Sequence, residues 1–139
     1  MRAPRSPLNL LQEIYQDNPW KIVVCCIMLN QTTGTQVHQI IKKLFRKYPS
    51  ARKMSKADPI ELSEIIRSCG LYNRRANSLI KFSQDYITKD WKEPNELYGV
   101  GQYAQDSYDI FVRDKMIRPA DKELKKYMQW KRKWLKTVK

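Results

Sequence analysis

Apolar residues along the chain recur at the three- and four-residue spacing of amphipathic helices, and short polar breaks separate these stretches. There is no convincing alternation of the kind that marks β-strands, and no internal repeat. The segment from Trp20 to Leu29 is apolar on nearly every face, and a helix of that kind is buried. The pattern predicts an all-α fold of about seven to eight helices with this segment at its centre.

Residues typical of helix ends divide the chain further. A glycine-containing break around residue 99 separates a short helix ending near residue 97 from a longer one reaching residue 111. The other expected boundaries are Ser6-Pro7 before a short helix with Leu8, Leu11 and Ile14 on one side, Asn18-Pro19 before the central helix, Thr33-Gly34 before a third, Asp58-Pro59 and Gly70 around a fourth, Asn73 as the cap of a fifth, and Pro119-Ala120-Asp121 before the last.

The length of 139 residues fits one domain over residues 1–139, and the 42% of hydrophobic residues suffices for a core. The formal charge of +13 opposes folding by self-repulsion and is best explained by a polyanionic partner. Nucleic acid is the first candidate and an anionic membrane surface is the alternative. The longest uncharged apolar run, Ile22 to Leu29, is far shorter than the roughly 20 residues that span a bilayer.

The segment from Leu97 to Tyr103 is the sharpest local motif, since its two glycines flank the single apolar residue Val100. Gly99 and Gly101 permit a tight turn that brings several backbone amides to one point. At a helix N-terminus such amides bind an anion, and here a DNA phosphate is expected. An ordinary helix–helix turn is the alternative.

Metal-binding residues are sparse. Cys25 and Cys26 are adjacent, Cys69 stands alone, and His38 is the single histidine, so the spacing matches neither a disulfide framework nor a zinc site. We expect no metal and no other cofactor.

Four segments in order resemble the endonuclease III superfamily of helix-hairpin-helix DNA glycosylases. Residues 97–103 resemble its hairpin, placed here at about residues 95–113, and Asp121 follows Tyr103 at the spacing that the family keeps before its catalytic aspartate. Residues 28–33 resemble the segment that fills the gap left by an extruded base, and residues 70–76 resemble the loop that enters the opposite strand. The likeness is strongest to the glycosylase domains of the methyl-CpG-binding domain protein 4 family, which excise thymine and uracil from mismatches.

The resemblance assigns roles to five side chains, each with a structural alternative. Asp121 is the expected catalytic carboxylate, or only the cap of the last helix. Tyr103 and Gln12 are expected to line the base pocket, the alternatives being a core tyrosine and an exposed helix residue. Gln31 and Leu71 are expected to enter the duplex as plug and wedge, the alternatives being a turn residue and a half-buried core leucine.

Two absences refine the implied activity. Relatives with an iron-sulfur cluster carry four cysteines after the aspartate, whereas this sequence has no cysteine after Cys69, so no cluster is expected. Bifunctional relatives carry a lysine nucleophile where Tyr103 stands, so we expect water to be the nucleophile and no lysine-dependent lyase step. The sequence departs from vertebrate relatives at Gln31, where those tend to have arginine.

The expected function is a monofunctional nuclear DNA glycosylase that acts as a monomer on double-stranded DNA and removes thymine or uracil opposite guanine. One alternative is a catalytically weak DNA-binding scaffold with the same fold. Another is a glycosylase for a different damaged or mispaired base. The basic segment after Asp121 is expected to attract phosphates from a solvated face, while Trp130 and Trp134 pack inward.

Overall fold

The computed structural model describes residues 3–138, so Met1, Arg2 and Lys139 of the expected domain lie outside the described residues. Within that range the chain is all-helical, with eight α-helices and two short 3₁₀ helices (η), which confirms the predicted fold class. The elements are α1 (Leu11–Ile14), α2 (Pro19–Leu29), α3 (Gly34–Lys47), α4 (Ala51–Ser55), α5 (Pro59–Ile65), η1 (Arg67–Cys69), α6 (Tyr72–Thr88), η2 (Pro94–Glu96), α7 (Gln102–Phe111) and α8 (Lys122–Thr137).

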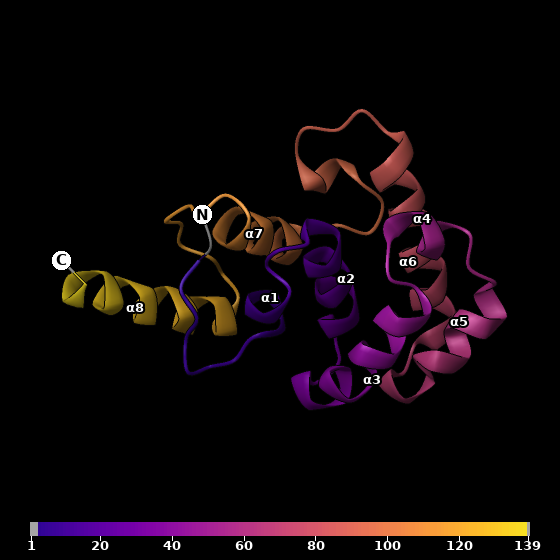
Figure 1. The fold of residues 1–139 in the computed structure, drawn as a ribbon, viewed down its shortest axis with the longest axis horizontal. Coiled ribbons are helices and arrows are strands. Elements are labelled where there is room, and N and C mark those ends of the chain that lie inside the picture. The colour runs from indigo at the N-terminus through magenta and orange to yellow at the C-terminus, as the bar shows by residue number, and fades with distance from the viewer. Residues whose placement is uncertain (1–2, 139) are drawn as a thin grey trace.

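Helix α2 occupies the centre of the molecule, as its uniformly apolar sequence predicts. Every residue from Ile22 to Met28 is buried, and α2 packs against α1, α3, α6 and α7. Figure 1 shows α2 between α1, α7 and α8 on one side and α3 to α6 on the other. Segments far apart in the sequence therefore pack on the two sides of this one buried helix.

Side-chain caps begin several helices where the sequence indicates them. The Asn18 side chain accepts a hydrogen bond from the Lys21 amide at 3.2 Å, and the Asp58 side chain accepts one from the Ile60 amide at 3.0 Å. Each cap precedes a proline in the first helical position, where the missing N–H costs nothing.

The structure corrects three of the predicted boundaries. The first helix begins at Leu11 rather than after Ser6-Pro7, and both Leu8 and Ile14 are 38% exposed. Asn73 does not cap α6, because the helix already begins at Tyr72 and its N-cap is Leu71. The short helix before the hairpin is the 3₁₀ helix η2, which ends at Glu96.

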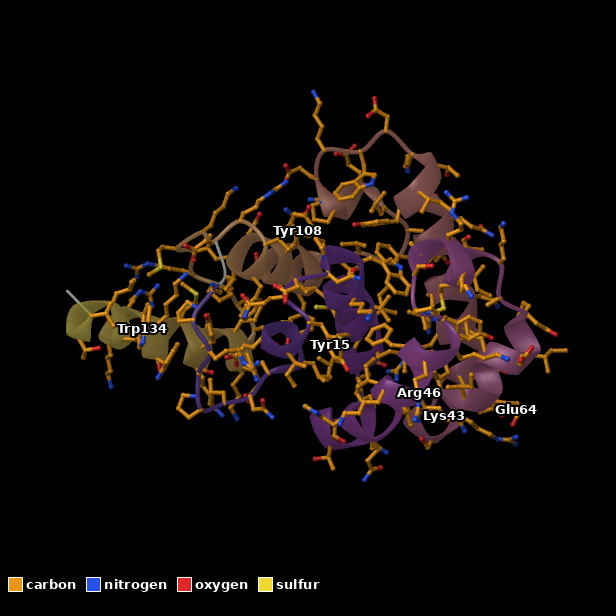
Figure 2. All side chains as sticks on the ribbon, viewed as in Figure 1. Tyr15, Lys43, Arg46, Glu64, Tyr108 and Trp134 are labelled. Carbon is orange, nitrogen blue, oxygen red and sulfur yellow. The ribbon has the colours of Figure 1, made fainter. Side chains whose placement is uncertain are left out.

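Helix α8 is held to the rest of the molecule by polar contacts as well as apolar ones. The Tyr127 hydroxyl donates to the Pro4 carbonyl at 2.7 Å, and the Lys131 ammonium forms an ion pair with Asp114 at 2.5 Å. Lys131 is only 3% exposed, so this part of the basic segment is not the solvated face that the sequence suggested. Trp130 and Trp134 stack 6.0 Å apart, and Figure 2 shows Trp134 at the far end of the molecule from Glu64 on α5.

None of the helices in residues 3–138 is long and apolar enough to cross a membrane. In the same residues, no three side chains of the types His, Cys, Asp and Glu gather as a metal site would require.

Candidate functional site

A cleft of about 950 Å³ opens beside the C-terminal end of α2. Gln12 of α1, Tyr103 of α7 and Asp121 at the start of α8 all line it, as does Gln31 from the loop after α2. Four of the residues singled out from the sequence therefore meet in one cavity, although they come from different elements. Their catalytic and base-binding roles stay predictions.

Gln12 holds the centre of a buried hydrogen-bond network at the floor of this cleft. It is 1% exposed, and its amide nitrogen Nε2 donates to the Tyr103 hydroxyl at 2.7 Å and to Ser107 Oγ at 3.2 Å. The Cys26 sulfur lies 3.9 Å from the same nitrogen. Within residues 3–138 no hydrogen bond is accepted by Gln12 Oε1, and Gln12 is among the residues that line the cleft. The amide is thus oriented with its donor side toward Tyr103 and Ser107.

Tyr103 keeps its phenolic proton in this setting. Burial raises the pKa of its hydroxyl well above the usual value, and the nearby Cys26 adds to the effect. Burial likewise raises the pKa of the Cys26 thiol to about 12. Because the Tyr103 oxygen accepts from Gln12, its own proton is free to donate into the cleft.

Asp121 combines a structural contact with a position in the cleft. Its Oδ2 accepts a hydrogen bond from the Leu124 amide at 2.9 Å. The residue therefore caps α8, which is the structural role that the sequence predicted for it beside the catalytic one. The side chain is half-buried and faces the same cavity as Tyr103 and Gln12. The amides at a helix N-terminus attract a negatively charged group, so the cap fixes the position of this carboxylate at the edge of the cleft.

The glycine hairpin lies directly before α7. Gly99 has φ 77°, a left-handed conformation that favours glycine, and Gly101 is the N-cap of α7. No side chain in residues 3–138 caps this helix, so its first amides are available to an anion. Val100 is half-buried against the core, which anchors the turn.

A second cleft of about 520 Å³ joins the hairpin to the two expected DNA-inserting residues. Gly99 and Gly101 line it together with Gln31 and Leu71. Gln31 has φ 61° and Leu71 has φ 48°, so both side chains sit on left-handed backbone that non-glycine residues adopt at a cost. Leu71 is 50% exposed rather than a core leucine.

Sequence reasoning missed several polar residues that shape the site. Glu13 is 1% exposed and accepts hydrogen bonds from the Ser6 amide and hydroxyl at 2.5 and 2.8 Å and from the Leu10 amide at 2.9 Å, which fixes the cleft wall over residues 6–10. Arg75, which is 5% exposed, links the loops that carry Gln31 and Leu71. The Glu13 contacts are local, within seven positions, whereas Asn30 lies 45 positions from Arg75, so local sequence gives no signal for that contact.

The chain matches the family described as HhH-GPD superfamily base excision DNA repair protein over residues 24–137. It is 34% identical over 131 residues to the methyl-CpG-binding domain protein 4-like protein of Arabidopsis thaliana, covering 93% of this chain and 29% of that protein. It is 32% identical over 94 residues to thymine/uracil-DNA glycosylase of Pyrobaculum aerophilum, covering 63% of this chain and 41% of that protein. The chain therefore spans less than half the length of these relatives.

Solved structures show the same architecture. A thermostable thymine-DNA glycosylase superposes with a TM-score of 0.66 at 27% identity, over 70% of this chain and 48% of that one. Endonuclease III in a non-covalent complex with DNA superposes with a TM-score of 0.65 at 26% identity, over 76% of this chain and 52% of that one. The chain belongs to the HhH-GPD superfamily of base excision DNA repair proteins.

Proposed function

We propose that this chain is a monofunctional, mismatch-specific DNA glycosylase that extrudes thymine or uracil opposite guanine and hydrolyses its N-glycosidic bond. The observation that carries the proposal is the convergence of Gln12, Tyr103 and Asp121 on one cleft next to a glycine hairpin. The similarity to thymine/uracil-DNA glycosylase supports the choice of substrate.

The polar groups of the cleft suit the imide edge of thymine or uracil. Such an edge carries a carbonyl oxygen, which accepts, beside an N3–H, which donates. We propose that the cleft offers the complementary pair, because within residues 3–138 the Tyr103 hydroxyl donates no hydrogen bond and Gln12 Oε1 accepts none. Cytosine presents an unprotonated N3 and an amino group at these places, so it would leave both protein groups without a partner.

The chemistry then needs one carboxylate and one water. The bond between C1′ of the deoxyribose and N1 of the base breaks, its electron pair leaves with the base, and positive charge builds on the sugar. Asp121 stabilises that charge and accepts a proton from the water whose oxygen bonds to C1′. The products are the free base, protonated by solvent, and an abasic deoxyribose with the backbone intact.

Strand cleavage is not part of the proposed reaction. A Schiff-base route needs an amine beside C1′, and the position of the family's lysine nucleophile is taken here by Tyr103. Borohydride should therefore trap no covalent enzyme–DNA complex, whereas a lyase would give one.

DNA binding in this proposal rests on the backbone of the duplex. The amides at the start of α7 contact a phosphate, and the charge of +13 attracts the rest of the duplex. The relative solved as an endonuclease III–DNA complex supports DNA as the partner. We propose that the chain acts as a monomer, since one cleft holds all the named groups, and in the nucleus, where such mismatches arise in genomic DNA.

Base release from otherwise identical duplexes holding G:T, G:U and A:T pairs tests the function. Hot alkali after the reaction cuts the strand at abasic sites, and omission of alkali reports any lyase step. We expect alkali-dependent cleavage at G:T and G:U and none at A:T. Binding of all three duplexes without cleavage would instead identify a scaffold, and cleavage of another lesion would identify a different substrate.

A further inference from the structure

The two loops expected to enter DNA meet at one buried side chain. Arg75 lies in the first turn of α6, where its amide donates to the Leu71 carbonyl at 2.9 Å. Its guanidinium Nη1 donates to the Cys69 carbonyl at 3.1 Å, and Nη2 donates to the Asn30 carbonyl. Asn30 directly precedes the plug residue Gln31, and Cys69 precedes the wedge residue Leu71 by two positions.

A further contact joins the same two loops. The Thr32 hydroxyl donates to the Cys69 carbonyl at 3.0 Å, so this one oxygen accepts from Arg75 and from Thr32. Both Gln31 and Leu71 have left-handed backbone, which persists only where surrounding contacts determine it. The guanidinium is therefore a single rigid group that is bonded to both loops, next to their strained residues.

Its surroundings set Arg75 apart from an ordinary structural arginine. Within residues 3–138 its guanidinium has no carboxylate partner, and its two contacts are to neutral carbonyls. Burying a cation against carbonyls alone is costly compared with burying a neutral group. A fork with several donors in one plane can nevertheless bond two loops at once, which a single ammonium or an apolar side chain cannot do equally well.

We propose that Arg75 is a positioning residue that couples plug to wedge, so that Gln31 and Leu71 move into the duplex together. This inference rests on the proposed function, because it assigns both loops to base extrusion. Without the coupling, each loop would enter or leave its own strand independently, and the extruded base would be held only by whichever loop happened to be inserted.

Fluorescence of 2-aminopurine tests the coupling without relying on catalysis. One duplex carries the probe beside the target base, in the strand that the plug enters; a second carries it beside the opposite guanine, in the strand that the wedge enters. The fluorescence of each probe reports the equilibrium constant for inserting the loop into its strand. With Arg75 in place, Leu71→Ala should lower this constant at both probes by a similar factor, on the order of 10-fold. In an Arg75→Met background, Leu71→Ala should lower it only at the opposite-strand probe.

Arg75→Lys is a second variant, which keeps the positive charge but loses the planar set of guanidinium donors. It replaces Arg75→Met in the experiment if Arg75→Met does not fold. The matched control is Arg74→Met, which removes an exposed cation from the same cleft and should leave the coupling intact. A cooperative thermal unfolding transition and affinity for a matched duplex should both persist in the Arg75 variants, whereas general damage to the fold would abolish them.

Equal responses of the two probes to Leu71→Ala in both Arg75 variants would overturn the inference, because the duplex itself would then supply the coupling. A response at the opposite-strand probe alone with Arg75 in place would overturn it as well. Failure of the proposed function gives a different result, namely no base release by the unaltered protein from G:T or G:U duplexes.

Discussion

The Gln12 amide nitrogen donates to the Tyr103 hydroxyl oxygen across 2.7 Å, and 91 positions in the sequence separate the two residues. This one bond determines which hydrogen-bonding groups the two side chains have left, because it uses a donor of Gln12 and an acceptor of Tyr103. In the proposed function, the pair consequently offers a base one donor and one acceptor, in an arrangement that neither residue would hold alone.

Removal of the phenolic oxygen should weaken the selection of the base. Tyr103→Phe deletes the donor offered to the substrate and leaves a buried Gln12 hydrogen without its partner. An unsatisfied buried polar group of this kind costs about 1–3 kcal/mol of free energy. We expect the single-turnover rate of thymine or uracil release to fall about 10- to 100-fold at nearly unchanged duplex affinity. Tyr108→Phe, which alters a tyrosine outside the cleft lining, is the control, and a rate loss equal to that of Tyr103→Phe would contradict the prediction.

The charge of Asp121 and its helix cap can be separated by substitution. Asparagine caps a helix about as well as aspartate, so Asp121→Asn should leave thermal stability nearly unchanged. Loss of the negative charge should lower the chemical step about 10²- to 10³-fold while DNA binding survives. Asp58→Asn changes the equivalent cap of α5 and should affect neither property. Near-normal base release by a folded Asp121→Asn protein would refute the mechanism.

The hairpin should contribute affinity that is independent of sequence. A Cβ added at Gly101 meets nothing within 4 Å in the protein, so Gly101→Ala should fold normally and obstruct only the phosphate. We expect weaker binding by a similar factor for matched and mismatched duplexes, since backbone contacts carry no sequence information. Gly99→Ala should in addition cost about 1 kcal/mol of stability, because φ 77° disfavours a side chain. Titration of several duplexes by fluorescence anisotropy checks both, and a loss confined to one sequence would count against the assignment.

The protein should lose stability in alkali for a defined reason. Burial raises the pKa of the Cys26 thiol to about 12 and raises the pKa values of Cys25, Tyr103 and Tyr127. The unfolded chain ionises these groups near 9.0 for thiols and 10.0 for phenols, so above about pH 9 it binds fewer protons than the folded state. The free energy of unfolding should therefore fall as the pH rises, by about 1.4 kcal/mol per pH unit for each group between its two pKa values.

Denaturant titrations between about pH 8 and pH 11 measure this slope. Cys26→Ala removes one of the ionising groups, so its slope should be shallower by the equivalent of one proton between about pH 9 and pH 11. An identical slope in the two proteins would show that the Cys26 thiol does not contribute.

Much of the fold follows from local sequence signals. Asn18-Pro19, Asp58-Pro59 and Asp121 each mark a helix start correctly, because capping depends on residues within three positions of one another. The start of α6 escaped prediction because its N-cap is Leu71, a residue that neither caps with its side chain nor favours left-handed backbone. Asn73, the residue with the stronger capping preference, lies inside the helix instead.

The candidate site likewise combines residues that local sequence predicts with residues that it does not. Asp121, Tyr103 and the glycines were identified by motif and spacing. In the structure Tyr103 lines both clefts, which it shares with Asp121 in the first and with Gly99 and Gly101 in the second. The burial of Gln12 was not predictable, since its hydrogen-bond partners Tyr103 and Ser107 lie 91 and 95 positions away. Local periodicity cannot distinguish such a residue from a polar one facing solvent.

The left-handed backbone at Gln31 and Leu71 sets thermal stability against the DNA-inserting roles that we propose for these two residues. Glycine adopts that conformation without the penalty of about 1–2 kcal/mol that a side chain incurs. A screen that rewards heat resistance alone should therefore enrich Leu71→Gly and Gln31→Gly, and the proteins it selects should melt later yet fail to hold DNA open. Anyone engineering a hardier version of this protein should leave both positions unaltered and seek stability elsewhere in the helical core.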